Sequence, residues 1–220
     1  MPQTTHIFTS PTAPGVTLNY LVYLPPDYDE AQTYPLILFL HGAGERGDDV
    51  NRITVTGLPQ RLDEGRDIRF IVVSPQCPED DWWSVYRFLL NALLDHVMAT
   101  YPIDQKRVYL TGLSMGGYGT WEMAFKYPQR FAAIAPICGG LLWAMPPEKV
   151  APVLKDMPAW VFHGAKDDTV PPQESQVIVD ALKALGSDVK FTLYPDADHD
   201  SWTVTYENDD LYEWFLQYSL

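Results

Sequence analysis

The segment Gly112-Leu-Ser-Met-Gly-Gly117 puts a serine where its hydroxyl could act as a nucleophile. The apolar run 107–111 before it is expected to form a buried strand, and the run 118–125 after it a helix. On so tight a strand-to-helix turn the serine side chain projects outward. Glycines two residues before and after it omit the Cβ atoms that would make strand and helix collide. The pattern predicts Ser114 as a catalytic nucleophile, whereas an ordinary Gly-rich turn would need no partner side chains.

A serine hydroxyl needs a base to take its proton, and imidazole has a suitable pKa. His199 lies in the polar loop 194–202, between the last predicted strand and the last predicted helix, where it could reach Ser114. The alternative for His199 is a solvated loop histidine. The other histidines are interpreted as a surface residue (His6), a structural or solvated helix residue (His96), and two loop-shaping residues that hydrogen-bond the backbone (His41 and His163).

A third group must hold the imidazole in one tautomer, which a carboxylate does best. The loop after the predicted strand 159–162 offers two adjacent acids, Asp167 and Asp168, and only one of them can point at His199. The order serine, acid, histidine is the one expected for a strand-turn-helix serine hydrolase. The acids beside the histidine, at positions 196, 198 and 200, are expected to be solvated.

Negative charge on a reacting carbonyl oxygen needs preorganised N–H donors. One predicted donor is the backbone N–H of Met115, directly after the serine. The other is expected from the glycine-dense loop 41–47, which follows an apolar strand and has an unobstructed backbone. The alternative, a phosphate-binding loop, would require a lysine after the second glycine, which is missing.

These side chains need a sheet to position them, and the chain alternates strand-like and helical runs. Strands are predicted at 15–24, 36–40, 70–73, 108–110, 131–135, 159–162 and 189–194, with helices at 85–101, 173–185 and 210–220. The first strand alternates in polarity as a half-exposed edge strand does, whereas the middle ones are continuously apolar, as buried parallel strands are. We therefore predict an α/β fold with a mostly parallel central sheet, helices on both faces and ligands at the carboxyl ends of the strands.

Composition limits the other possibilities. A chain of 220 residues, 46% hydrophobic and 20% charged, can bury one core, so a single domain over residues 1–220 is expected. The net charge of −14 argues against nucleic acid and anionic membrane surfaces as partners. Cys77 and Cys138 form no C-x-x-C motif and are expected to be buried free thiols. The N-terminus shows no secretory signal, so a cytoplasmic location is expected unless a signal or larger parent chain was removed.

Together the motifs resemble the α/β-hydrolase superfamily, in particular compact bacterial esterases of the dienelactone-hydrolase-like, phospholipase/carboxylesterase-like and peptidase-like groups. The resemblance covers nearly the whole chain, through segments 41–47, 75–78 with Trp82 and Trp83, 112–121, 163–171 and 198–202. It implies an α/β-hydrolase fold without a large lid, Asp167 as the catalytic acid and the N–H of Ala43 as the second oxyanion donor. It also implies that no metal and no organic cofactor is needed.

The expected function is a serine carboxylesterase that hydrolyses short-chain esters through an acyl-enzyme. Four tryptophans, Trp83, Trp121, Trp143 and Trp202, are candidates to line the cleft, with core packing as the alternative for each. A second candidate function is feruloyl or acetyl-xylan ester hydrolysis on plant polysaccharide. A third is a non-hydrolytic binding protein on the same fold. The partner is therefore expected to be a small-molecule or polysaccharide-linked ester, and the sequence indicates no oligomeric state.

Overall fold

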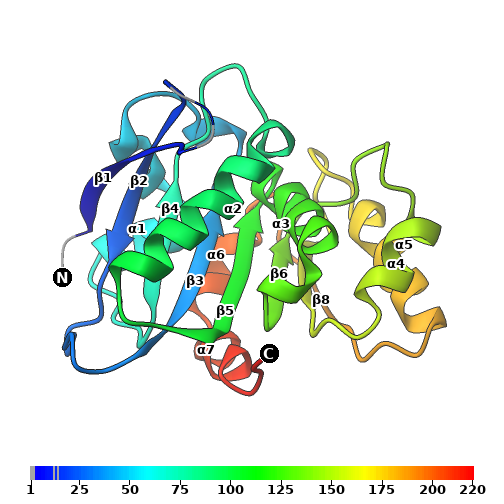
Figure 1. Ribbon diagram of the computed structural model, residues 1–220. Coiled ribbons are helices and arrows are strands. Elements are labelled where there is room, and N and C mark those ends of the chain that lie inside the picture. Colours follow the sequence, from blue (N-terminus) through cyan, green and yellow to red (C-terminus); the bar gives the residue numbers. More distant parts are fainter. Residues whose placement is uncertain (1–2, 12, 14) are drawn as a thin grey trace.

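One eight-stranded sheet forms the centre of the molecule (Figure 1). The structure is a computed structural model that describes residues 3–11, 13 and 15–220. Within these residues the strand order is β1-β2-β4-β3-β5-β6-β7-β8. The strands are β1 (Thr4–Thr9), β2 (Thr17–Tyr23), β3 (Tyr34–Leu40), β4 (Ile71–Pro75), β5 (Ile103–Leu113), β6 (Ala133–Ile137), β7 (Trp160–Gly164) and β8 (Lys190–Tyr194).

The sheet is mixed, as predicted. β1 pairs with β2 and β2 with β4 in antiparallel fashion, and all pairs from β4 through β3 to β8 are parallel. The prediction that the strand at 15–24 is an edge strand is wrong, because β1 covers its outer side. β1 itself was not predicted. Only Phe8 of its six residues is buried, so its apolar pattern is weak, although its threonines favour a strand.

Helices cover both faces of the sheet, as predicted. They are α1 (Gly57–Asp63), α2 (Trp83–Thr100), α3 (Met115–Lys126), α4 (Pro147–Leu154), α5 (Gln173–Ala184), α6 (Trp202–Glu207) and α7 (Asp209–Phe215). Short 3-10 turns lie at Ala43–Glu45, Val50–Val55 and Pro128–Arg130. Among the helices, α1, α4 and α6 were not predicted, and the last predicted helix ends five residues early, at Phe215.

Two hydrophobic cores lie on opposite faces of the sheet, and alternate residues of β3 contribute to each. Its residues Leu36, Leu38 and Leu40 pack in one core with side chains of α2 to α5, whereas Ile37 and Phe39 pack in the other with side chains of α1, α6 and α7. Figure 1 shows α2 and α3 crossing one face of the sheet with α6 behind it. Since successive strand residues point to opposite faces, a continuously apolar strand is what two such cores require.

The parallel strands bring several loops to one end of the sheet. The loops after β3, β5, β7 and β8 all begin at carboxyl ends of neighbouring parallel strands. In open parallel sheets this edge is where ligands bind. The predicted reactive residues all lie in or beside these loops.

Candidate active site

Ser114 occupies a strained turn between β5 and α3. Its backbone φ of 52° is in the left-handed region, which residues other than glycine seldom adopt. The turn needs the two flanking glycines. A Cβ on Gly112 would lie 2.5 Å from the carbonyl oxygen of Gly116, and one on Gly116 would lie 1.9 Å from that of Leu40. The predicted role of these glycines, close approach of strand and helix, is therefore confirmed.

The structure brings Ser114, His199 and Asp167 into one hydrogen-bonded line. His199 Nε2 lies 3.0 Å from Ser114 Oγ, and His199 Nδ1 lies 2.7 Å from Asp167 Oδ2. An ionised carboxylate only accepts, so Nδ1 carries the proton and the Nε2 lone pair faces the serine hydroxyl. The carboxylate is itself fixed, because its Oδ1 accepts the backbone N–H groups of Thr169 (3.0 Å) and Val170 (2.8 Å).

Between the two adjacent acids, geometry selects Asp167. Its side chain is fully buried against the imidazole, whereas Asp168 is exposed. The acids around the histidine, at positions 196, 198 and 200, are also exposed, as expected for a solvated loop.

Gly164 lets the loop that carries the acid pass close to the loop that carries the histidine. A Cβ on Gly164 would lie 2.0 Å from the carbonyl oxygen of Asp198. Two backbone hydrogen bonds tie the loops together: Ala165 N–H donates to Tyr194 O (2.8 Å) and Lys166 N–H donates to Ala197 O (3.0 Å). The contact between Asp167 and His199, 32 residues apart, thus rests on backbone pairing as well as on their own hydrogen bond.

The two predicted oxyanion donors begin short helical segments beside the serine. Met115 is the first residue of α3 and Ala43 the first of a 3-10 turn, so neither N–H has a partner within its own segment. The loop after β3 lies against the serine turn, since a Cβ on Gly42 would be 3.7 Å from Ser114 Cβ. Neither N–H therefore donates within its own segment, and both segments border the serine turn.

Side chains hold the backbone of the loop at 42–45. Four consecutive carbonyl oxygens accept hydrogen bonds from side-chain nitrogens, which fixes the orientation of the peptide groups between them. The donors are His41 to Gly42 (2.6 Å), Arg46 to Ala43 (2.9 Å), Arg52 to Gly44 (2.9 Å) and Gln76 to Glu45 (3.1 Å). Of these donors the sequence reasoning assigned a loop-shaping role only to His41. Gln76 belongs to the motif at 75–78, and that motif is the sequence feature from which its role could have been inferred.

His41 is a neutral, buried histidine. Its Nε2 accepts the backbone N–H of Cys77 (2.9 Å), so the ring proton is on Nδ1 and is donated to the carbonyl of Gly42. Burial lowers the pKa of His41 to about 4, partly opposed by its hydrogen bond to Gly42. The predicted loop-shaping role is confirmed.

The four candidate tryptophans separate into three groups. Trp83 and Trp121 are 1% and 0% exposed and lie in the core with α2 and α3, so the prediction that they line the cleft is wrong. Trp202 packs edge-to-face on the His199 ring at 5.2 Å between centroids. Trp143 is 96% exposed, in the loop after β6, beside a hollow of about 340 Å³ formed with α5. Aromatic residue type alone did not distinguish core from surface.

Both cysteines are buried and free, as expected. Within the described residues, the thiol of Cys138 and the side chains of Asp167 and His199 offer ligand atoms within 4.8 Å of one another. Burial raises the pKa of the Cys138 thiol, so it does not supply a thiolate, and the other two groups already bond each other. This donor set therefore suits proton transfer better than metal binding.

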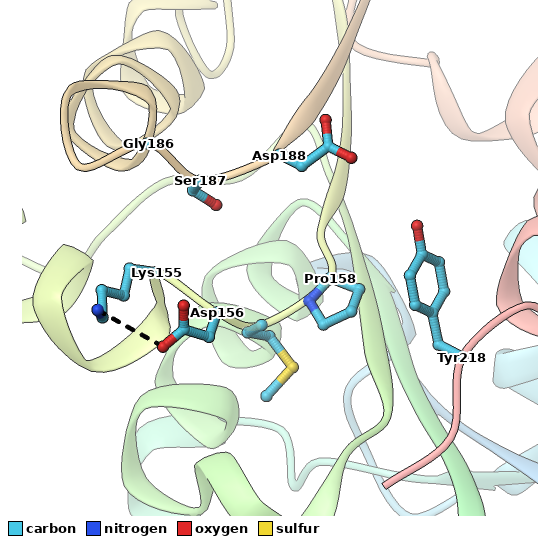
Figure 2. A pocket seen from close by; sticks show the side chains of 8 residues that line it. Lys155, Asp156, Pro158, Gly186, Ser187, Asp188 and Tyr218 are labelled. Carbon is cyan, nitrogen blue, oxygen red and sulfur yellow. Dashed lines mark ion pairs between the residues drawn. The ribbon is translucent and has the colours of Figure 1, made fainter.

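A polar pocket of about 250 Å³ lies at the other end of the strands (Figure 2). Its lining includes Pro158, just before β7, and Asp188, just before β8, together with Tyr218 near the C-terminus. Pro158 and Asp188 lie at the amino ends of strands, whereas Ser114 follows the carboxyl end of β5, so the pocket and the serine lie at opposite ends of the strands.

In the part of the chain that is described, no helix combines the length and apolar character needed to cross a bilayer.

Comparisons with known proteins find esterases and related hydrolases. The Esterase family model matches residues 12–175, and a prolyl oligopeptidase family model matches residues 143–219. The chain is 31% identical over 147 residues to a poly(3-hydroxyoctanoate) depolymerase of Pseudomonas fluorescens, covering 57% of this chain and 50% of the relative. It is 28% identical to a bifunctional acetylxylan esterase/xylanase of Neocallimastix patriciarum, covering 71% of this chain and 22% of the relative.

A solved structure of a thermostable esterase superposes with a TM-score of 0.82 at 32% identity, covering all of this chain and 64% of that one. The chain thus spans half or less of the length of these two curated relatives. The Esterase model nevertheless matches most of the chain and includes both the serine turn and the acid. The chain belongs to the Esterase family, within the α/β-hydrolase superfamily of serine hydrolases.

Proposed function

We propose that the chain is a serine carboxylesterase that hydrolyses short-chain carboxylic esters through an acyl-enzyme. The observation that carries this proposal is the hydrogen-bonded line from Ser114 through His199 to Asp167, at 3.0 and 2.7 Å. Membership of the Esterase family supports it. The strained serine turn supports it as well, because such strain persists where function requires it.

The proposed reaction begins with attack of Ser114 Oγ on the ester carbonyl carbon. His199 Nε2 takes the hydroxyl proton, and its Nδ1–H remains on the carboxylate of Asp167, which stabilises the imidazolium. The carbonyl oxygen becomes an oxyanion held by the N–H groups of Ala43 and Met115, each contributing about 3 kcal/mol to transition-state stabilisation.

Breakdown of this intermediate releases the alcohol, which receives the proton from His199. Water then enters, gives a proton to the same imidazole and attacks the acyl carbon. As the acyl–Oγ bond breaks, His199 returns that proton to Ser114 Oγ, so the acid leaves and the serine is restored. No described residue other than these three side chains and two amides is needed for the proton and charge balance.

A panel of p-nitrophenyl esters of increasing acyl length tests the proposal, with Ser114→Ala as the inactive control. We expect the highest kcat/KM for acetate and butyrate and covalent labelling by a fluorophosphonate probe only in the wild type. A wild-type protein that neither turns over activated esters nor takes the label would instead be a non-hydrolytic binding protein.

Hydrolysis of feruloyl or acetyl esters on plant polysaccharide is a second candidate, favoured by one observation. Trp143 lies almost fully exposed in the loop that follows the carboxyl end of β6, the end of the sheet where the triad loops also begin. It borders a hollow of about 340 Å³, where its ring could stack on a ring of the substrate. Release of acetate and ferulate from arabinoxylan tests this. We expect Trp143→Ala to lower that release while sparing p-nitrophenyl acetate, and Phe88→Ala, an exposed aromatic on α2, to change neither.

A further inference from the structure

A second histidine contacts the same carboxylate oxygen as His199 does. His163 Nε2 lies 3.2 Å from Asp167 Oδ2 and 2.8 Å from the carbonyl oxygen of Val170, and the side chains of both His163 and Asp167 are fully buried. The bond to Val170 confirms the sequence-based prediction that His163 shapes its loop. The contact with Asp167 goes beyond that role.

The neighbours of the His163 ring determine where its proton lies. Both oxygens near Nε2, the Val170 carbonyl and the Asp167 carboxylate, can only accept, so Nε2 carries a proton in every charge state of the ring. Nδ1 lies 2.8 Å from Ser175 Oγ, which can donate to it. Burial lowers the pKa of His163, against the opposing effects of Val170 and Asp167. The neutral ring protonated on Nε2 is therefore the form at neutral pH.

The hydroxyl of Ser175 completes this arrangement. Its oxygen lies 2.8 Å from His163 Nδ1 and 2.7 Å from the carbonyl oxygen of Gly139. Its single proton can be donated to only one of these two acceptors. With a neutral ring the proton points at Nδ1; protonation of the ring would send it to Gly139. Ser175 is therefore compatible with a proton on Nε2, which the two acceptors beside Nε2 already require.

We propose that His163 is a positioning residue that acts on ester hydrolysis through Asp167, because its Nε2–H, hydrogen-bonded to the carbonyl of Val170, also lies 3.2 Å from the oxygen that orients His199. This proposal rests on the proposed function of the triad. Backbone N–H groups hold Oδ1 of the acid, and the Nε2–H edge of His163 lies 3.2 Å from Oδ2, so both oxygens face positive dipole ends. The donor also draws negative charge from Oδ2, which moderates its attraction for a proton on His199. Asp167 and His199 are the titratable groups that act on the ring.

Two substitutions separate the donor from simple packing. His163→Leu removes the donor, whereas His163→Gln can place an amide N–H near the position of Nε2. With p-nitrophenyl acetate, we expect the leucine variant to lose about tenfold in kcat with little change in KM, because it loses both the N–H dipole beside Oδ2 and the hydrogen bond to Val170. The acid limb of its kcat/KM profile should move to higher pH by about half a unit, since Asp167 then attracts the proton on His199 more strongly. The glutamine variant should recover most of both.

A purely structural role predicts a different result. Both variants would lose thermal stability, and the acid limb would stay in place in each; that outcome would overturn the proposal. Ser175→Ala serves as the matched control, because it removes the Nδ1 contact and leaves the Nε2 contact. It should leave the acid limb unchanged.

Heteronuclear NMR of wild-type protein labelled in its imidazole rings tests the proposal without any variant. We expect the His163 ring to be neutral and protonated on Nε2 at pH 7, and a proton on Nδ1 alone would refute the assignment. If the wild type hydrolyses no ester, the proposed function fails, and the NMR result still decides the tautomer by itself.

Discussion

Replacing Asp167 by asparagine should invert the hydrogen bonding of His199. Oδ1 of the acid accepts two backbone N–H groups, from Thr169 and Val170, so the asparagine oxygen must stay at that position to keep both bonds. The amide NH₂ then occupies the position of Oδ2, 2.7 Å from His199 Nδ1. An NH₂ donates, so Nδ1 must accept and the ring proton moves to Nε2.

With the proton on Nε2, the imidazole has no lone pair for the hydroxyl of Ser114 and cannot act as its base. We expect kcat for p-nitrophenyl acetate to fall about 10⁴-fold, the size of effect known for the wrong tautomer of a serine triad. That factor corresponds to about 5 kcal/mol of transition-state stabilisation. The oxyanion donors remain, so a residual rate above the uncatalysed one should persist.

Asp168→Asn provides the matched control, because Asp168 is adjacent, carries the same charge and is exposed. Its kcat should stay within about twofold of the wild type, as usual for a surface substitution. Urea unfolding of both variants checks that neither has lost its fold. If Asp168→Asn cost more rate than Asp167→Asn, or if Asp167→Asn kept kcat within about tenfold, the tautomer reasoning would be refuted.

Three further outcomes follow from the same geometry. Ser114→Ala should leave circular dichroism and the melting temperature near those of the wild type while abolishing fluorophosphonate labelling; retained labelling would place the nucleophile elsewhere. Gly116→Ala should lower the free energy of unfolding in urea by more than about 4 kcal/mol, because its Cβ would lie 1.9 Å from the carbonyl oxygen of Leu40. Gly44→Ala is the control: a Cβ there meets open space, so the free energy of unfolding should change by less than about 1 kcal/mol. His41, with a pKa lowered to about 4 in the folded state, costs stability only as pH falls below the unfolded value of 6.5. Between pH 7 and pH 5 the wild type should therefore lose about 2 kcal/mol more in urea unfolding than His41→Gln, and equal losses would contradict a neutral buried ring.

The serine turn could be predicted from the sequence because its requirements are local. Gly112 and Gly116 must be glycines for steric reasons that depend on neighbouring backbone, and an apolar strand and a helix must flank them. The central strands were found for a similar reason, since burial on both faces demands continuous apolar runs. β1 was not predicted because it is an edge strand with a single buried side chain, Phe8, and so needs little apolar pattern.

Tertiary contacts settled what local pattern left open. From the residues alone, Asp167 and Asp168 were equivalent, and the choice depends on which carboxylate the backbone of the loop directs at His199. The role of Trp83 likewise depends on the element packed against it: it is buried beside His41, at 4.9 Å between ring centroids. A single sequence records no such distances, because they arise only when separate elements pack.

The sequence by itself determined the class of fold, the serine turn and the order serine, acid, histidine, because each depends on short-range spacing and burial. Only the tertiary structure decided which acid meets the histidine, which tryptophans remain exposed, and that four side chains hold the carbonyls of the loop at 42–45. Gln76 shows the reason: its amide reaches that loop across 31 residues of chain, and only the parallel pairing of β3 with β4 brings the two segments together.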